Sequence, residues 1–268
     1  MFTGMTGERA RSGLAGSRFA DLEWVAETGS TNTDLLDEAR RGASEGRVLV
    51  ADHQLAGKGR LGRRWDAPAG ASLLASVLVR PALEPDRLHL LTLAMGVALV
   101  EAMDSIDVDA GLKWPNDLVV DTSEGERKLA GVLAESLLEG TPGPGGVRAV
   151  VLGFGLNVAW GDDVPDELDS IAVALDHLGV RADREDLLVE ILRNFERWYA
   201  AVSDPHGSAA LLDAYRRRCV TLGRRVRVET PDDEMEGDAV EVDDAGRLLV
   251  STSAGTREVT VGDVVHIR

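Results

Sequence analysis

The sequence predicts an α/β protein that ends in a small β-barrel. Through residue 220, short apolar runs of strand length alternate with longer segments in which apolar residues recur at helical spacing. After Gly223 the pattern changes to five short alternating runs separated by turn residues, which is typical of a small barrel. With 268 residues, the chain is long enough to bury a sizeable core in one main domain and a small second one.

We therefore divide the chain into three parts. Residues 1–18 are rich in glycine, serine, threonine and arginine and lack an apolar pattern, so we expect a flexible N-terminal tail. Residues 19–220 form the main α/β domain, and residues 221–268 form the barrel. The tail is too short to hold a helix-turn-helix domain.

Short apolar runs bounded by turn residues predict the strands of the main domain. In order, these runs are Leu22–Thr28, Val48–His53, Leu73–Val79, Gly111–Trp114, Leu118–Asp121, Leu129–Leu138 and Val147–Val158. Two glycines interrupt the last run, and the Pro- and Gly-rich residues 141–146 before it predict a loop.

Helices are predicted where the apolar period lengthens. The polar triplet Ser30-Thr31-Asn32 is typical of an N-cap region, and the helix after it contains Leu35, Leu36 and Ala39. The segment Leu88–Met103 is apolar on nearly every side, so we expect a well-buried helix. Two further helices are expected at Leu187–Val202 and Ser208–Arg218.

The predicted barrel strands are short and separated by Asp, Gly, Pro and Ser residues. They are Val226–Glu229, Ala239–Val242, Leu248–Val250, Glu258–Val261 and Val264–Ile267.

Charge and composition exclude several classes of protein. The net charge of −17 argues against a general affinity for nucleic acid or anionic membranes. The single cysteine, Cys219, cannot form an intrachain disulfide, which fits a reducing cytoplasm. There is no apolar run of membrane-spanning length, no signal-peptide core and no metal-ligand spacing among the five histidines. We expect a cytoplasmic protein with neither a nucleic-acid nor a membrane partner.

The most informative stretch is residues 57–65, Gly-Lys-Gly-Arg-Leu-Gly-Arg-Arg-Trp. It places four cations and three glycines between two predicted strands of an acidic protein. Glycine backbone N–H groups and arginine forks together suit a phosphate group. The stretch matches neither the GxxxxGK[ST] loop nor a GxGxxG that opens a helix. On its own, it is equally compatible with a solvated, mobile turn.

Three weaker motifs follow at strand ends. Residues 113–117 read Lys-Trp-Pro-Asn-Asp, where Pro115 forms a rigid turn, and residues 127–131 read Arg-Lys-Leu-Ala-Gly. Residues 153–157 read Gly-Phe-Gly-Leu-Asn, which puts both glycines and Asn157 on one face of a strand and leaves a flat surface for a ring or ligand. Taken singly, the three motifs also fit an ordinary turn, a solvated edge charge and a bulged strand.

In this order and spacing, the motifs closely resemble those of the biotin protein ligase family. The resemblance runs from about Leu22 to the C-terminus and implies a catalytic α/β domain with a mixed sheet and flanking helices, followed by an SH3-like barrel. Larger members of the family carry an N-terminal DNA-binding helix-turn-helix domain. This chain lacks that domain, so it resembles the monofunctional members.

The resemblance also implies a reaction of the biotin–[acetyl-CoA-carboxylase] ligase type. Biotin and Mg-ATP give biotinyl-5′-AMP and pyrophosphate. A lysine amine of a biotin carboxyl carrier protein domain then attacks the mixed anhydride, which gives an amide and AMP. ATP with Mg²⁺ is the implied cofactor, although no side-chain motif for the metal is present. No nucleophilic side chain is required, which agrees with the absence of a catalytic triad.

Site residues follow from the matched motifs. The implied biotin-binding residues are Ser30, Thr31, Asn32, Gln54, Gly57, Lys58, Gly59, Arg60, Lys128, Gly131, Gly153 and Gly155. The implied ATP and adenylate contacts are Arg60, Arg63, Trp65, Asn116, Lys128 and Asn157.

The catalytic candidates are Arg60, Lys128 and Asp117. Carboxylate attack on ATP brings two anions together, so cations must neutralise their repulsion. Arg60 and Lys128 supply that charge, with Arg63 as a third candidate. Asp117 positions either the acceptor lysine or Mg²⁺. The glycines of the basic loop allow it to act as a lid that ligand anions order.

One departure from the family pattern and two alternative functions stay open. Lys58 stands where the family has arginine, and lysine keeps the charge but loses the bidentate fork. A lipoate or octanoate ligase shares the α/β scaffold, although the motifs at residues 57–65 and 113–117 favour biotin. A non-catalytic nucleotide-binding module is the other alternative. Whether the chain forms a homo-oligomer is open as well.

Overall fold

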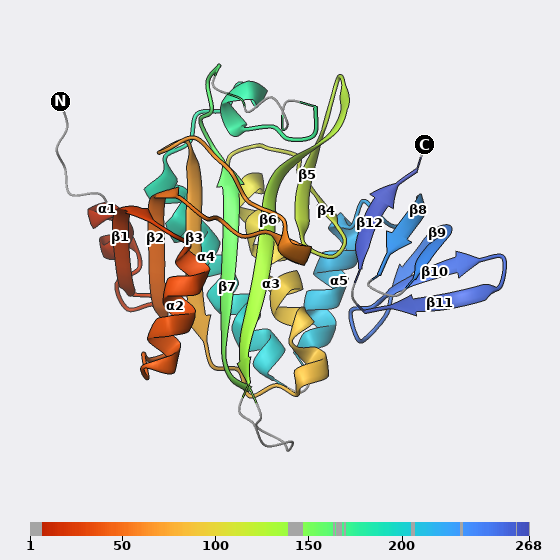
Figure 1. Cartoon of the computed structure of the whole chain (residues 1–268), viewed down its shortest axis with the longest axis horizontal. Coiled ribbons are helices and arrows are strands. Elements are labelled where there is room, and N and C mark those ends of the chain that lie inside the picture. Colours follow the sequence, from red (N-terminus) through yellow and green to blue (C-terminus); the bar gives the residue numbers. More distant parts are fainter. Residues whose placement is uncertain are drawn as a thin grey trace.

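A seven-stranded mixed sheet forms the centre of the computed structural model, and a five-stranded antiparallel sheet lies beside it (Figure 1). The structure describes residues 7–138, 147–162, 164, 168, 170–204, 207–230, 233–260 and 262–267. The loop predicted at residues 141–146 lies outside these residues. No helix within them is long and apolar enough to span a membrane.

The central sheet has the strand order β1-β2-β3-β7-β6-β5-β4. Only β1 and β2 pair in parallel, and every other neighbouring pair is antiparallel. The predicted mixed sheet is therefore confirmed. The strands are β1 (Asp21–Thr28), β2 (Arg47–Gln54), β3 (Ser72–Val79), β4 (Gly111–Lys113), β5 (Asp117–Thr122), β6 (Gly125–Leu138) and β7 (Val147–Asn157).

Helices cover both faces of this sheet. Helix α2 (Thr31–Arg40) packs alone on one face, where Leu35 and Ala39 meet Leu78 of β3 and Val151 of β7. On the other face lie α1 (Glu8–Gly13), α3 (His89–Asp104), α4 (Arg184–Ser203) and α5 (Ser208–Arg218). Three short 3₁₀ turns complete the described helices: η1 (Arg60–Gly62), η2 (Pro85–Arg87) and η3 (Leu175–Leu178).

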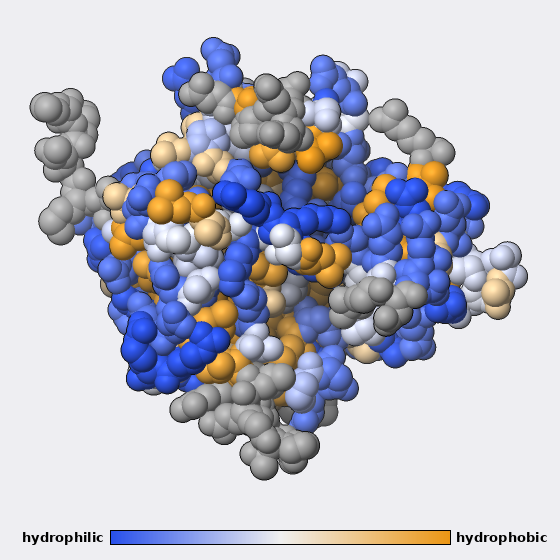
Figure 2. Space-filling model, viewed as in Figure 1, coloured by the Kyte–Doolittle hydropathy of each residue, from blue (hydrophilic) through white to orange (hydrophobic). Residues whose placement is uncertain are grey.

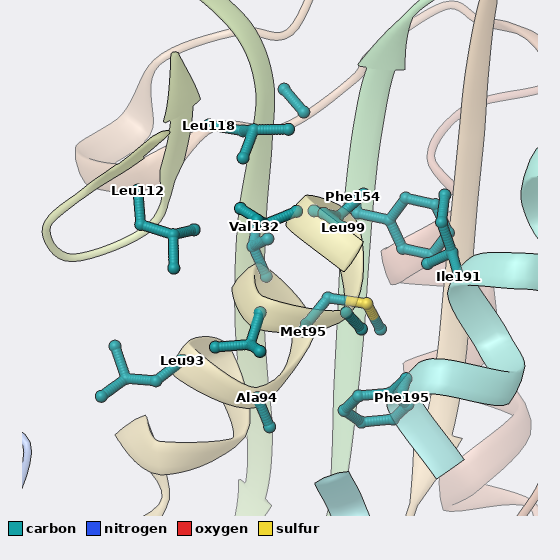
Figure 3. Packing of buried hydrophobic residues seen from close by; sticks show 14 of the residues in the cluster. Leu93, Ala94, Met95, Leu99, Leu112, Leu118, Val132, Phe154, Ile191 and Phe195 are labelled. Carbon is teal, nitrogen blue, oxygen red and sulfur yellow. The ribbon is translucent and has the colours of Figure 1, made fainter. Parts of the chain in front are cut away.

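The core lies on the face opposite α2. Helix α3 is buried on nearly every side, as its sequence predicts, because it is placed between the sheet and α4. Figure 3 shows the ring of Phe154 of β7 between Leu99 of α3 and Ile191 of α4. Met95 of α3 lies beside Phe195 of α4. This packing fixes β6 and β7 in place, and the opposite face of these two strands carries the site.

The prediction of a flexible tail is wrong for residues 7–18. Residues 8–13 form α1, and the apolar side chains Ala10, Leu14 and Phe19 are fully buried against the core. The Glu185 carboxylate also accepts a hydrogen bond from the Ala10 backbone N–H at 3.0 Å. These three buried residues are spread over ten positions. So short a pattern does not distinguish a packed segment from a linker on sequence alone.

A strand overlaps each of the five predicted C-terminal ranges, although the fourth begins three residues earlier than predicted. The strands are β8 (Arg225–Glu229), β9 (Glu234–Val242), β10 (Leu248–Thr252), β11 (Gly255–Val259) and β12 (Asp263–His266), and they pair antiparallel in the order β11-β10-β9-β8-β12. Strand β9 begins five residues earlier than predicted, because its first half alternates charged residues with Met235 and Gly237 and carries little apolar signal.

Polar contacts join this sheet to the main domain. The Trp114 indole N–H donates to the Gly246 carbonyl oxygen at 3.3 Å, and Arg216 Nε donates to the Val242 carbonyl oxygen at 2.6 Å. Both contacts come from segments next to the edge strand β4. The C-terminal sheet is therefore fixed beside the end of the central sheet that carries residues 113–117.

Leu14→Ala tests whether α1 is part of the folded domain. We expect the free energy of unfolding to fall by about 2–4 kcal/mol, because a fully buried leucine leaves a cavity when it is truncated. Ser12→Ala is the matched control, since Ser12 is exposed on the same helix and should change stability by less than about 0.5 kcal/mol. Chemical denaturation measures both, and equal effects would support the flexible tail.

Candidate active site

The basic loop at residues 57–65 folds back on itself as a tight hairpin. The Trp65 backbone N–H donates to the Gly57 carbonyl oxygen at 3.0 Å, and the Gly59 N–H donates to the Arg63 carbonyl oxygen at 2.7 Å. At its tip, Leu61 (φ 54°) and Gly62 (φ 76°) take left-handed conformations. A Cβ atom on Gly57 would lie 2.3 Å from the Trp65 carbonyl oxygen, so only glycine fits there.

Trp65 rests on strands β6 and β7 at positions that have no side chain. A Cβ atom on Gly155 would lie 2.4 Å from the Trp65 ring, and one on Gly131 would lie 2.9 Å from it. Two residues before Gly155 on β7, a Cβ atom on Gly153 would lie 2.1 Å from Asn32 Oδ1 of helix α2. The sequence prediction of a flat surface at the two β7 glycines is therefore confirmed, and an indole ring lies on it.

A buried hydrogen-bond network lies between α2 and the sheet. Asn32 Oδ1 accepts from the Ser76 hydroxyl at 2.6 Å, and Asn32 Nδ2 donates to Glu135 Oε2 at 2.9 Å. Gln54 Oε1 accepts from both the backbone N–H of Thr31 (2.8 Å) and its hydroxyl (3.0 Å). The Gln54 carbonyl oxygen is thus fully used, which leaves its NH₂ group as the donor available to a ligand.

The sequence did not identify Ser76 or Glu135, but its prediction of an N-cap region at residues 30–32 is confirmed. Ser30 occupies the N-cap position of α2, but its side chain makes no capping bond, while Thr31 and Asn32 join the network. The signals for the two missed residues were weak. Ser76 is a fully buried hydroxyl in the apolar strand β3, and Glu135 is a lone carboxylate in the apolar run of β6.

Two cavities meet at Trp65. The inner cavity lies under α2 and the loop, and every predicted biotin position lines it except Gly57. The outer cavity is lined by Arg63, Asn157, Lys113, Glu126 and Trp160, among others. Of the predicted ATP contacts, Arg60 and Asn116 line the inner cavity, and Arg63 and Asn157 line the outer one. Trp65 and Lys128 line both.

Figure 2 shows hydrophilic residues across the middle of this face, over β6 and β7, with hydrophobic residues exposed around them. In Figure 1 the loop between β2 and β3 crosses the sheet at the same place. Exposed apolar side chains near it include Leu55, Leu61 and Ile171. The face of the site is thus polar at its centre and apolar at its margin.

Each cation of the site has a polar or acidic partner. Lys128 Nζ lies 2.7 Å from Asp117 Oδ1 and 5.3 Å from the centre of the Trp65 ring. Lys58 Nζ lies 3.2 Å from Glu135 Oε1. Asp117 and Lys128 come from neighbouring strands, β5 and β6, whose pairing places them at the same end of the sheet.

Arg60 and Arg63 reach the C-terminal sheet. The Arg60 guanidinium donates to Asn116 Oδ1 at 2.9 Å and lies 3.8 Å from Asp263, with which Arg63 also forms an ion pair. Burial lowers the pKa of Arg60, against the opposing effects of Asp263 and Asp117. The guanidinium stays charged at any physiological pH, so a buried positive charge lies next to the inner cavity.

Two polar atoms at the junction of the cavities have no hydrogen-bond partner among the described residues: Trp65 Nε1 and Asn157 Oδ1. Asn157 is buried, and its NH₂ group donates to the Val173 carbonyl oxygen at 3.0 Å. Buried polar atoms usually have partners, so these two atoms are suited to a bound ligand. Within the described part of the chain, no group of three or more His, Cys, Asp or Glu residues could hold a metal ion.

The chain matches two family models. Residues 24–157 match the biotin/lipoate A/B protein ligase family, and residues 221–267 match the biotin protein ligase C terminal domain. The chain is 40% identical to the biotin–[acetyl-CoA-carboxylase] ligase of Mycobacterium tuberculosis over 95% of this chain and 92% of that protein. It is 31% identical to the enzyme of the same name from Paracoccus denitrificans, over 90% of this chain and 98% of that one.

A solved structure gives the same relationship. The chain is similar to the biotin protein ligase from Aquifex aeolicus in complex with biotin and ATP, with a TM-score of 0.78 and 27% identity over 93% of this chain and 100% of that one.

Gly155→Ala tests whether Trp65 depends on the bare strand surface. The added methyl group would displace the ring, so trypsin should cut the Lys- and Arg-rich loop at least about fivefold faster, in line with about 1 kcal/mol of local opening. Gly29→Ala is the control, because a Cβ atom there meets no atom within 4 Å. Limited proteolysis followed by mass spectrometry measures both variants, and unchanged cleavage of Gly155→Ala would contradict this packing.

Proposed function

The chain belongs to the biotin protein ligase family and is an ATP-dependent ligase, and we propose how its residues divide the two-step reaction between the two cavities. One observation carries the division. Lys128 lines both cavities, so its ammonium group lies where a carboxylate in the inner cavity and a phosphate in the outer cavity would meet.

Biotin occupies the inner cavity in this proposal. The ureido ring needs hydrogen-bond donors and acceptors, and the network of Thr31, Asn32, Ser76 and Gln54 presents both at the closed end. The valeryl chain runs past the edge of the Trp65 ring, which itself covers Gly131 and Gly155. Its carboxylate then points toward Lys128.

The adenylation step follows from these positions. A biotin carboxylate oxygen attacks the α-phosphorus of ATP, and the bond from that phosphorus to the oxygen bridging to the β-phosphate breaks, which releases pyrophosphate. Lys128 and Arg60 neutralise the repulsion between the two anions, and burial of Arg60 strengthens its effect because little water screens a buried charge. Asp117 holds the Lys128 ammonium in place through their ion pair.

The adenosine part occupies the outer cavity in this proposal. Asn157 Oδ1, which has no partner among the described residues, accepts from a polar group of the nucleotide, and Trp65 offers a ring face. A Mg²⁺ ion bound to the phosphates would shield their charge. It commonly needs only one or two protein carboxylates, and the carboxylate of Asp117 fits that requirement.

Transfer is the second step. The neutral amine of an acceptor lysine attacks the acyl carbon of biotinyl-5′-AMP, the bond from that carbon to the phosphate oxygen breaks, and the amine loses a proton as AMP leaves. We propose that the acceptor is a biotin carboxyl carrier protein domain in the cytoplasm, as the names of the two relatives suggest. We also propose the division into a main domain at residues 19–220 and a C-terminal domain at residues 221–268.

Pyrophosphate release from Mg-ATP tests the proposal. Biotin, lipoate and octanoate are supplied in turn, with hydroxylamine present to trap any acyl-adenylate. Turnover with biotin alone is the expected result. Activity with lipoate or octanoate but not biotin would assign the chain to the other branch of the matched family, and no turnover with any of them would favour a binding module. A purified carrier domain then tests transfer through the added biotinyl mass.

Removing either central cation should abolish most of the adenylation rate. We expect Arg60→Ala and Lys128→Ala each to lose about two or more orders of magnitude in kcat/KM, the usual effect of losing a preorganised charge contact. Arg40→Ala is the control, since Arg40 lies at the exposed end of α2 and pairs only with Asp37 among the described residues. Initial rates of pyrophosphate release measure all three, and rates near wild type would remove the two residues from the mechanism.

Lys58→Arg restores the family residue. An arginine fork can bind an anion through two donors, so we expect KM for biotin or ATP to fall several-fold. This change corresponds to a gain of about 0.5–1 kcal/mol in binding free energy. The lysine now bonds Glu135, and a guanidinium can keep that contact. Steady-state kinetics with each substrate varied in turn decide the question. Unchanged KM values would show that this departure from the family has no functional weight.

A further inference from the structure

Strand β12 places a histidine against the edge of the site. The His266 side chain is 10% exposed. Its Nδ1 atom lies 3.1 Å from Glu126 Oε1 of β6, and its Nε2 atom lies 3.1 Å from the Thr221 hydroxyl oxygen. The histidine therefore joins β12 both to β6 of the main domain and to Thr221 at the start of the C-terminal part.

The direction of the hydrogen bond between His266 and Glu126 follows from the ionised state of the carboxylate. Burial by itself would raise the pKa of Glu126, but the hydrogen bond and charge of His266 and the charges of Lys113 and Arg224 outweigh it and hold the pKa below its ordinary value. An ionised carboxylate only accepts hydrogen bonds, so the Nδ1–H of His266 donates to Glu126. The Thr221 hydroxyl oxygen accepts from the Trp114 backbone N–H at 3.0 Å and lies 3.1 Å from His266 Nε2, so a chain of hydrogen bonds runs from Glu126 to Trp114.

Both ends of this chain of hydrogen bonds reach the site. At one end, Trp114 precedes the turn that carries Asn116 and Asp117. Asn116 accepts the hydrogen bond from Arg60 at 2.9 Å, and Asp117 pairs with Lys128 at 2.7 Å. The position of that turn therefore sets the position of both catalytic cations.

At the other end, Glu126 and Lys113 line the outer cavity. Lys113 Nζ lies 3.8 Å from Glu126 Oε1, and Arg224 lies 3.2 Å from Glu126 Oε2. Three basic groups thus share one carboxylate, so the carboxylate cannot neutralise all of them. His266 occupies part of its hydrogen-bonding capacity, which leaves the Lys113 ammonium available to an anion in the cavity.

We propose that His266 is a positioning residue for the triphosphate of ATP, acting through Glu126 on Lys113 and through Thr221 on the turn at residues 114–117. Without the imidazole, Glu126 turns to Lys113 and Thr221 loses a partner, so nucleotide binding weakens more than biotin binding. This inference rests on the proposed placement of ATP in the outer cavity. It assigns to the C-terminal sheet a role that the matched motifs do not contain.

His266→Ala and His266→Gln test the inference together with a control. The dissociation constant of Mg-ATP is measured by titration calorimetry, and KM for ATP, KM for biotin and kcat are measured by pyrophosphate release. We expect His266→Ala to raise the dissociation constant and KM for ATP about tenfold, the change expected for losing one hydrogen-bonded contact. KM for biotin should stay within about twofold, while kcat falls because the turn that positions Arg60 and Lys128 shifts.

His266→Gln keeps an amide donor and acceptor in the same place and should recover most of the affinity for ATP. His89→Ala is the matched control, because His89 also contacts the C-terminal sheet, through the Ala245 carbonyl oxygen at 2.5 Å, but does not line the outer cavity. It should leave the affinity for ATP unchanged. A melting temperature for each variant identifies any that unfolds.

The outcomes separate the inference from the proposed function. An unchanged dissociation constant in a folded His266→Ala variant overturns the inference, even if the wild-type chain adenylates biotin. Equal losses in His266→Ala and His89→Ala overturn it as well, since they indicate general docking of the sheet. A wild-type chain that binds ATP but does not turn over biotin, with the tenfold loss in His266→Ala, supports the inference and overturns the proposed function.

Discussion

The site depends on one steric constraint, the absence of side chains at adjacent positions of strands β6 and β7. Gly131 and Gly155 pair directly across the two strands, and together they leave the backbone bare under the Trp65 ring. Gly153 does the same under Asn32. A methyl group at these positions would collide with the ring or with the amide, so the inner cavity, the loop and helix α2 could not keep their present arrangement. The core on the opposite face, with Phe154 between the two β7 glycines, keeps that surface rigid.

A second constraint is electrostatic. The chain carries a net charge of −17, which opposes the approach of ATP and carboxylates, so the site needs a local excess of cations. Unpartnered cations so close together would repel one another. The structure pairs Lys58 with Glu135, Lys128 with Asp117, and Arg63 with Asp263. An incoming anion must therefore compete with carboxylates, which favours a multiply charged phosphate over a weakly charged ligand.

Strands, helices and motif residues were predictable from the sequence because each produces a local signal. Turn residues and periodicity located the strands, and the glycines two apart in β7 predicted a bare surface on one face. What the sequence did not indicate are residues whose role arises only from packing. Ser76 is one small hydroxyl in an apolar strand, Glu135 and His266 are single polar residues near strand ends, and their partners are 44, 103 and 140 positions away in sequence. Such distances are set by the sheet order, which no local pattern encodes.

The C-terminal sheet takes part in the site through one short strand. Asp263 and His266 stand at the two ends of β12, which pairs with β8 over its whole length. Asp263 contacts the basic loop, and His266 contacts the start of β6 and Thr221. A four-residue strand held in register can move these two side chains only together. Any displacement of the sheet would therefore change the partners of Arg63 and the wall of the outer cavity in the same step. Strand β12 thus couples the position of the basic loop to the position of the outer cavity wall, although the two are far apart in sequence.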